Sequence, residues 1–251
     1  MRPRANEAAG ELARGGEELA WRRVDGAGRT VLWLGGFNSD MTGTKAQTLA
    51  YWATDKGRSY LRFDYSGHGE SSGAFADGTI GAWREDALAV IDELTEGPLI
   101  LVGSSMGGWL ACLAALARPE RIKALVLVAP AADFTEKLME PELSDEARAA
   151  LERDGVWMRP SDFGDDYPIS RTLLEEGRRW SILPGPVAIT VPVRILQGDM
   201  DYDVPWRHAQ ALSEALTGKD VTFTLIEEGD HRLARPEDLA RLIAAVEEVS
   251  V

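Results

Sequence analysis

A serine lies in a glycine-flanked turn that could make it a nucleophile. Residues 103–107 read Gly-Ser-Ser-Met-Gly, directly after the apolar run Leu99–Val102 and directly before a helical pattern. Glycine permits close backbone packing and allows a strained turn between a strand and a helix. This context predicts that Ser105 Oγ projects above the end of a sheet as a nucleophile for acyl transfer. The alternative interpretation of the same five residues is a glycine-rich turn with surface serines.

A serine hydroxyl needs a base to take its proton, and this chain contains three histidines. His231 follows the last predicted strand, so it lies at a carboxyl end and comes after the acidic candidates in chain order. His68 lies in a Gly-His-Gly turn and is expected to support that turn. His208 falls within a helical pattern and is expected on the helix surface. We therefore expect His231 to be the general base.

The acid that orients this base is sought among three alternating aspartates, Asp199, Asp201 and Asp203, which follow a predicted strand. The alternation resembles the start of a calcium loop. The sixth position, however, is Val204 where glycine is required, and the twelfth is Gln210 where glutamate is required, so no metal is expected. The spacing Gly-x-x-Asp-x-x-Val-Pro favours Asp201. Asp203 and Asp199 remain alternatives.

The negative charge of a tetrahedral intermediate needs two backbone N–H donors. One is expected from Met106, the residue after the nucleophile. The other is expected from Phe37, because the preceding Gly35 and Gly36 follow an early strand and permit a close approach. Alternatively, these two glycines simply end the strand.

Composition limits the class of protein. The 251 residues, 45% of them hydrophobic, can bury a single large core, or a core with one insertion. The formal net charge of −14 argues against nucleic acid and anionic membrane surfaces as partners. Cys112 is the single cysteine, so no internal disulfide forms, and its apolar helical surroundings predict a small core residue rather than a nucleophile.

Two further observations concern location. The stretch Met1–Gly16 is polar, lacks an apolar segment of the kind found in secretory signals, and carries acidic residues unlike a mitochondrial transit peptide. Apolar runs are all shorter than a membrane span, so stable membrane insertion is not expected. From these features we expect a cytoplasmic location.

Apolar runs alternate with helical periodicity along most of the chain. The predicted strands are Thr30–Leu34, Tyr60–Asp64, Leu99–Val102, Ala124–Ala129, Val193–Gln197 and Val221–Ile226. The predicted helices are Lys45–Lys56, Trp83–Leu94, Met106–Arg118, Trp206–Leu216 and Pro236–Val249. The middle four strands are almost continuously apolar, which indicates burial on both faces. The pattern predicts an α/β fold with a mostly parallel central sheet flanked by helices.

The alternation stops between residues 132 and 183, where helix-like stretches and large apolar residues appear without a strand signal. These residues are Phe134, Leu138, Met139, Trp157, Met158, Phe163, Tyr167, Trp180 and Leu183. Such a segment is too long for a connector, so we expect a helical lid insertion at 132–183. Its apolar residues either line an acyl-binding pocket or form the lid's own core. Residues 19–131 and 184–251 would then form the core domain, and residues 1–18 a flexible segment.

With these residues in place, the chain resembles the α/β-hydrolases from about Leu19 to Val249, and among them the abhydrolase-domain palmitoyl-protein thioesterases with their bacterial relatives. Phe63–Ser71 matches a turn of the α/β-hydrolases in general. The segments that match the thioesterases are Gly36–Ala46, Arg62–Gly67, Leu101–Leu110, Val204–Trp206 and Asp230–Arg232. The resemblance implies an α/β-hydrolase fold that needs no cofactor. It also implies that Ser105, Asp201 and His231 form the nucleophile, acid and base.

The resemblance further implies hydrolysis of S-acyl cysteine thioesters in proteins, and of acyl-glucuronide esters. The expected partner is therefore an acylated protein or a small acyl ester or thioester. Two alternatives remain. One is a small-ester or carbon–carbon bond hydrolase with the same three residues, and the other is a ligand-binding protein of this fold without turnover.

Overall fold

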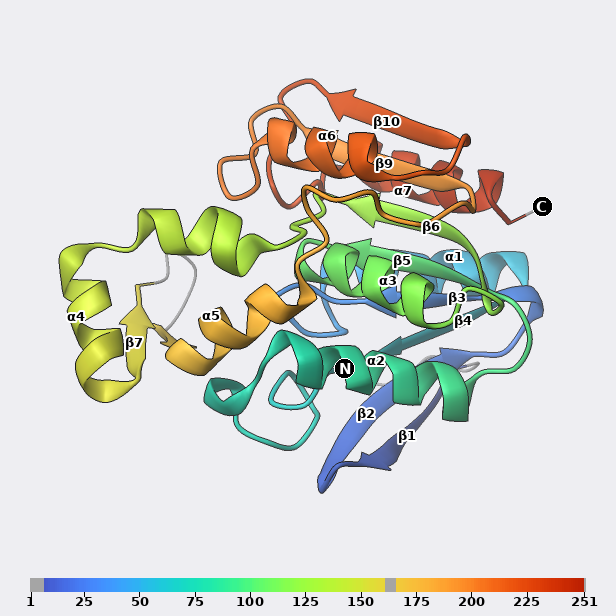
Figure 1. Cartoon of the computed structure of the whole chain (residues 1–251). Coiled ribbons are helices and arrows are strands. Elements are labelled where there is room, and N and C mark those ends of the chain that lie inside the picture. The colour runs from blue at the N-terminus through green and yellow to red at the C-terminus, as the bar shows by residue number, and fades with distance from the viewer. Residues whose placement is uncertain (1–6, 161–165, 251) are drawn as a thin grey trace.

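The computed structural model describes residues 7–160 and 166–250, and its central feature is an eight-stranded sheet (Figure 1). The strand order is β1-β2-β4-β3-β5-β6-β9-β10. The strands are β1 (Glu7–Arg14), β2 (Glu17–Val24), β3 (Ala27–Leu34), β4 (Arg58–Phe63), β5 (Leu99–Ser104), β6 (Ile122–Val128), β9 (Val193–Gly198) and β10 (Val221–Ile226). The six from β4 to β10 pair in parallel, whereas β1 and β2 are antiparallel to their neighbours. The predicted mostly parallel sheet is confirmed.

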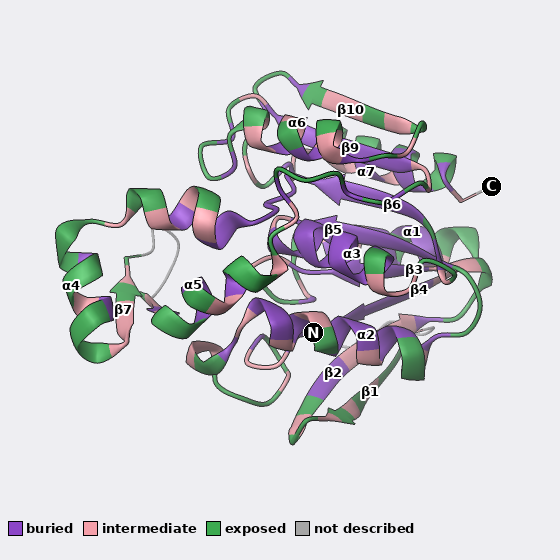
Figure 2. Cartoon of the chain, viewed as in Figure 1, coloured by how far each residue is buried: buried purple, intermediate pink, exposed green. Residues whose placement is uncertain are grey.

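The inner strands are buried on both faces because their alternate residues enter two separate cores. In β3, Leu32 and Leu34 join one core, while Val31 and Trp33 join the other. All six residues of β5 are buried, as are all six of β9. Figure 2 shows this burial in the central strands and the greater exposure of the edge strands. The apolar runs in the sequence arise from this two-sided packing.

Helices cover both faces of the sheet (Figure 1). Those whose side chains join the core with Leu32 are α2 (Ile80–Leu94), α3 (Met106–Ala117) and α6 (Trp206–Ala215); those on the other face are α1 (Thr44–Lys56) and α7 (Pro236–Glu248). The sequence predicted all five of these helices, with boundaries within a few residues of those observed. Within 7–160 and 166–250, none of the helices has the length and apolar character needed to cross a bilayer.

The stretch between β6 and β9 projects away from the sheet, at the left of Figure 1. Its elements are the π-helix Thr135–Met139, the short helix Glu140–Glu142, α4 (Asp145–Asp154), β7 (Val156–Arg159), β8 (Tyr167–Ser170), α5 (Arg171–Gly177) and the short helix Arg178–Trp180. β7 and β8 form an antiparallel hairpin that the sequence did not predict. Its strands have four residues each, too few for a clear alternation pattern. Phe163, counted among the apolar residues of this insertion, lies outside the described residues.

The expectation that residues 1–18 form a flexible segment is wrong for the part described. Residues 7–14 and 17–24 form the β1–β2 hairpin, and β2 pairs with β4 in the central sheet. Gly15 and Gly16 both have positive φ, 61° and 94°, in the two-residue turn. A Gly-Gly pair between two runs of this length is a hairpin signal that the sequence carries. Residues 1–6 lie outside the described residues.

Close packing of α3 against the end of β3 gives a first testable prediction. A Cβ added at Gly107 would lie 2.1 Å from the carbonyl oxygen of Leu34 and 2.5 Å from that of Gly35, both backbone atoms. We expect Gly107→Ala to lower the free energy of unfolding by about 1–3 kcal/mol, because the helix must move away from the strand. Gly185→Ala is the control, since nothing lies within 4 Å of its added Cβ. Equal unfolding midpoints in urea for the two variants would contradict this.

Candidate active site

Ser105 occupies a strained turn between β5 and α3. Its φ of 55° and ψ of −120° lie in a region that non-glycine residues seldom adopt, at a cost of about 1–3 kcal/mol. The surrounding backbone fixes this conformation: the N–H of Ser105 donates to the carbonyl of Val128 at 2.9 Å, and its own carbonyl accepts from Ala131 at 3.1 Å. The end of β6 therefore braces the turn.

Glycines make this turn possible by allowing backbone segments to touch. A Cβ at Gly103 would lie 2.2 Å from the carbonyl oxygen of Gly107, so only glycine fits there. Gly36 lies against Ser105 from the other side, with its added Cβ 3.4 Å from Ser105 Cβ. The loop after β3 and the turn after β5 therefore meet at the nucleophile candidate.

The structure brings three of the predicted residues into one hydrogen-bonded chain. His231 Nε2 lies 3.1 Å from Ser105 Oγ, and His231 Nδ1 lies 2.9 Å from Asp201 Oδ2. Each residue follows a different strand (β5, β9 or β10), so the carboxyl ends of three parallel strands converge on one point. An ionised carboxylate only accepts, so Nδ1 carries the proton and Nε2 is free to accept from the serine hydroxyl.

Asp201 is held rigidly by its own loop. Its side chain is fully buried. Oδ1 accepts from the N–H groups of Asp203 at 3.0 Å and Val204 at 2.8 Å, and Oδ2 also accepts from Gln197 Nε2 at 3.0 Å. Gln197 is a positioning residue that sequence reasoning did not identify; the signal was an amide at the end of an otherwise apolar, buried strand.

The two alternative acids, Asp199 and Asp203, do not bond to His231 as Asp201 does. Within the described residues, the imidazole of His231 is hydrogen-bonded to Asp201 and to neither Asp199 nor Asp203. Asp203 is exposed, although one of its carboxylate oxygens, one of Asp201 and one ring nitrogen of His231 all lie within 4.8 Å of one another. The oxygens of Asp201 already accept four hydrogen bonds, which suits an acid that orients a histidine.

The other two histidines lie in other surroundings. His68 is buried with its ring against Tyr65, Phe75 and Trp83, and burial lowers its pKa to about 4. His208 was expected on a helix surface, but its Nε2 lies 2.6 Å from the carbonyl of Ala132, and burial lowers its pKa. The helix surface at this position is covered by the chain that leaves β6.

The two predicted oxyanion donors belong to chain segments next to Ser105. Met106 begins α3, so its N–H belongs to the first turn of that helix, and Phe37 follows Gly36 in the loop against Ser105. The Phe37 ring packs at centroid distances of 4.9 Å from Phe75, 5.5 Å from Phe134 and 5.9 Å from Tyr167. An aromatic surface that includes the β7–β8 hairpin therefore borders the site.

Cys112 lies within the core. It is fully buried in α3, and burial raises the pKa of its thiol to about 12. A thiol with so high a pKa is not a nucleophile at neutral pH.

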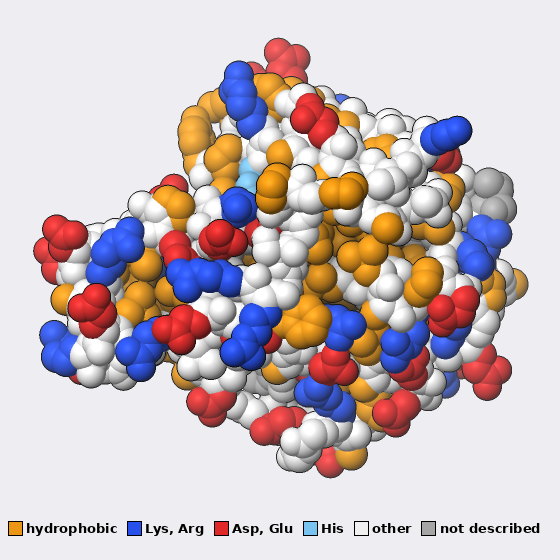
Figure 3. Space-filling model, viewed as in Figure 1, with side chains coloured by type: hydrophobic (Ala, Val, Ile, Leu, Met, Phe, Trp, Pro, Cys, Tyr) orange, Lys and Arg blue, Asp and Glu red, His pale blue; other side chains and the backbone are white. Residues whose placement is uncertain are grey.

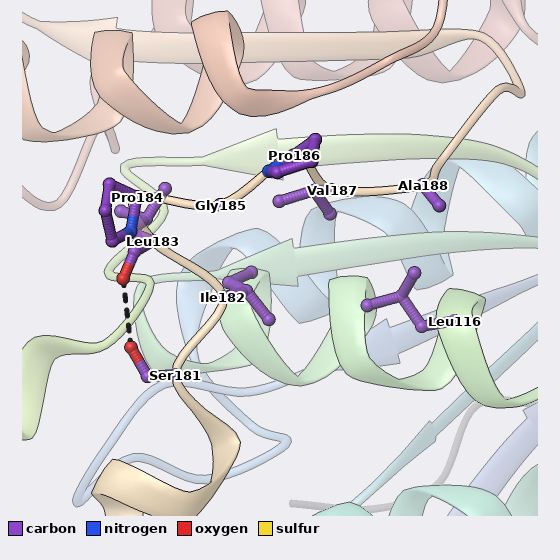
Figure 4. A pocket seen from close by; sticks show the side chains of 9 residues that line it. All are labelled: Leu116, Ser181, Ile182, Leu183, Pro184, Gly185, Pro186, Val187 and Ala188. Carbon is purple, nitrogen blue, oxygen red and sulfur yellow. Dashed lines mark hydrogen bonds between the residues drawn. The ribbon is translucent and has the colours of Figure 1, made fainter.

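An apolar pocket of about 480 Å³ opens elsewhere on the molecule (Figure 4). It is lined by Leu116 in the last turn of α3 and by residues 181–188, the chain that returns from the insertion to β9. Figure 3 shows hydrophobic side chains at the surface in this region, between α6 and α2. Ser105 precedes the first turn of α3, so about 16 Å of helix separates it from Leu116. The pocket contains none of the predicted site residues.

Comparison with known proteins identifies the family. The profile described as "Serine aminopeptidase, S33" matches residues 27–162. Palmitoyl-protein thioesterase ABHD10, mitochondrial, of Bos taurus is 37% identical over 92% of this chain and 76% of that protein. The chain belongs to the α/β-hydrolase family.

Solved structures agree with this assignment. A putative hydrolase from Agrobacterium vitis S4 superposes on this hydrolase with a TM-score of 0.92 and 42% identity, covering 98% of each chain. Alpha/beta hydrolase domain-containing protein 10 from mouse superposes with a TM-score of 0.87 and 35% identity, over 96% of this chain and 98% of that one. The expectation of an enzyme in the ester and thioester hydrolase class is confirmed.

The relatives also correct one expectation. The matched proteins of Bos taurus, Mus musculus and Homo sapiens are all named as mitochondrial. This finding contradicts the cytoplasmic location, which was expected from the composition of residues 1–16 rather than from the folded domain.

The acid can be assigned by substitution. Asp201→Asn is expected to lower kcat by about 10⁴-fold while leaving the fold intact, because an amide no longer fixes the imidazole tautomer. Asp203→Asn, at an exposed position two residues away, is expected to lower kcat by less than about tenfold. Steady-state kinetics of both variants on one aryl ester show which aspartate orients His231. A loss under about tenfold for Asp201→Asn would assign the role to Asp203 or Asp199.

Proposed function

We propose that this α/β-hydrolase cleaves S-acyl thioesters of protein cysteines, with a long fatty acyl group, through an acyl-enzyme on Ser105. The observation that carries the proposal is the hydrogen-bonded chain from buried Asp201 through His231 to Ser105. The choice of substrate rests on the similarity to palmitoyl-protein thioesterases, which extends over 92% of this chain.

In the first half-reaction, His231 Nε2 takes the proton of Ser105 Oγ as that oxygen bonds to the acyl carbon. The carbonyl oxygen becomes an oxyanion and accepts hydrogen bonds from the N–H groups of Phe37 and Met106. Each such donor contributes on the order of 10²–10³ to the rate. The carboxylate of Asp201 stabilises the imidazolium. When the intermediate collapses, the carbon–sulfur bond breaks, and the leaving thiolate takes the proton from His231.

In the second half-reaction, water replaces the thiol. His231 Nε2 removes a proton from the water as its oxygen attacks the acyl carbon of the ester on Ser105. The carbon–Oγ bond then breaks, Ser105 regains its proton from His231, and the fatty acid leaves. A thiolate departs readily without strong protonation, so one base that serves in both halves suffices.

The insertion at residues 132–183 is proposed to act as the lid and to contribute to the acyl site. Phe134 and Tyr167 come from this insertion, and both rings contact Phe37 beside Ser105. Other apolar residues of the insertion, among them Met139 and Leu183, are buried and join the same core as Leu32 of the sheet. The aromatic surface bordering Phe37 is therefore the part suited to receive an acyl chain.

The reaction class is tested by comparing two substrates. The native protein is expected to hydrolyse both an S-palmitoylated peptide and a small aryl ester, whereas Ser105→Ala is expected to lose turnover of both by at least about 10³-fold. Continuous thiol and phenol detection gives kcat/KM for each. Turnover of the aryl ester alone would retain the serine chemistry and replace the thioester with an oxygen ester as substrate. Failure of fluorophosphonate to label Ser105 would favour a ligand-binding protein without turnover.

The lid contribution is tested at Tyr167. We expect Tyr167→Ala to lower kcat/KM about tenfold for a palmitoyl substrate and less than about twofold for an acetyl substrate, because only a long chain reaches this ring. Met158→Ala is the control: Met158 is 50% exposed on the opposite face of the same hairpin. An equal loss on both substrates with Tyr167→Ala would mean that the ring only stabilises the lid.

A further inference from the structure

The loop that carries His231 has few constraints of its own. Glu228 and Leu233 have positive φ, 54° and 42°, conformations that non-glycine residues adopt at a cost. Within the loop, the N–H of Gly229 donates to Ile226 at 3.1 Å, and that of Leu233 donates to the Asp230 carboxylate at 2.9 Å. The position of the imidazole therefore also depends on bonds from outside the loop, the first of which the N–H of Met200 donates to the carbonyl of Gly229 at 2.9 Å.

Two basic side chains supply such bonds by donating to carbonyls on either side of His231. Arg235, at the start of α7, donates to the carbonyl of Glu228 at 3.1 Å and is itself held by buried Asp238 at 2.8 Å. Lys45 Nζ donates to the carbonyl of Arg232, the residue directly after His231. Arg235 is close in sequence, whereas Lys45 comes from the first turn of α1, 187 residues away.

The ammonium of Lys45 lies among charges from three other elements. The carboxylates of Asp230 in the His231 loop, Asp201 in the loop after β9 and Asp238 in α7 all act on it, as does the Arg232 guanidinium. Burial is the largest effect and lowers the pKa of Lys45 to about 8, although these three carboxylates oppose the shift. Lys45 therefore loses its proton in the mildly alkaline range, at a lower pH than an ordinary surface lysine does.

We propose that Lys45 is a positioning residue for the reaction: its ammonium holds the carbonyl after His231 and thereby keeps the imidazole aligned between Asp201 and Ser105. The proposal rests on the proposed function, because it requires His231 to be the general base. A charge-assisted hydrogen bond is roughly twice as strong as a neutral one. Deprotonation weakens this bond and removes a positive charge that acts on the three carboxylates, so the loop is released.

This role predicts a specific pH dependence. In the native protein, kcat should fall about ten- to hundredfold as pH rises through the pKa of Lys45, because a small displacement of the base is costly. KM should change little, since Lys45 bonds to the loop behind the imidazole rather than to an acyl group. Lys45→Arg keeps a cation that does not deprotonate below about pH 12, so the alkaline fall should disappear. Lys45→Met should show a low kcat at every pH.

The experiment measures kcat and KM for a small aryl ester from about pH 6 to about pH 10, with Ser105→Ala as the blank for spontaneous hydrolysis. The native protein is compared with Lys45→Arg, Lys45→Met and the control Lys56→Met, a substitution at the exposed far end of α1. The expected result is an alkaline fall in kcat for the native protein and Lys56→Met, its loss in Lys45→Arg, and a uniformly low kcat in Lys45→Met. Thermal unfolding at each pH separates loop release from global unfolding.

Two results would overturn the proposal. One is a native kcat that stays flat through the alkaline range, a result that needs no variant to fold. The other is an alkaline fall that persists unchanged in Lys45→Arg. Turnover by Ser105→Ala equal to that of the native protein would instead refute the proposed function, so the two failures are distinguishable.

Discussion

The backbone conformation of Ser105 is the constraint on which the rest of the site depends. With a φ of 55°, the residue turns the chain sharply from β5 into α3, and its side chain then meets His231 at 3.1 Å. Contacts with neighbouring segments, rather than the conformational preference of Ser105 itself, maintain this strained backbone. The chain at the ends of β3 and β6 contacts the turn directly. Gly103 and Gly107 are required because the backbone segments at these positions approach more closely than a side chain allows. A sheet buried on both faces supplies the rigidity that such a turn needs.

The same architecture brings the site together from distant parts of the chain. Ser105, Asp201 and His231 are separated by 96 and 30 residues in sequence but lie at the carboxyl ends of parallel strands. Ser105 is fixed by its turn, and Asp201 by the N–H groups of Asp203 and Val204. The loop of His231 instead accepts hydrogen bonds from Lys45 and Arg235, which lie outside it. The loops differ in how firmly they are held, and that of His231 depends most on side chains from elsewhere. In the proposal above, the positive charge of Lys45 therefore affects the position of the His231 imidazole, although Lys45 bonds to the loop and not to the ring.

Much of this arrangement could be predicted from the sequence, because the physics that shapes it is local or periodic. The inner strands are continuous apolar runs because both faces are buried, and Ser105 carries the glycine spacing that its turn requires. His231 and Asp201 were selected by their places after strands, and the structure brings both to Ser105. Contacts between distant elements could not be predicted in this way. No periodicity reveals that His208 meets Ala132, or that Lys45 reaches the His231 loop. The β1–β2 hairpin differs from these contacts, because the pair Gly15 and Gly16 is a turn signal from which it could have been predicted.

The central claim is that the acyl group passes through Ser105, and trapping that intermediate tests it most directly. The native protein would be mixed with an S-palmitoylated peptide, quenched in acid within the first turnover, digested and mapped by mass spectrometry. The account predicts a palmitoyl mass on the peptide that contains Ser105, absent when the quench follows complete turnover. Full thioester cleavage in that first turnover, with the Ser105 peptide unmodified at every quench time, would contradict it.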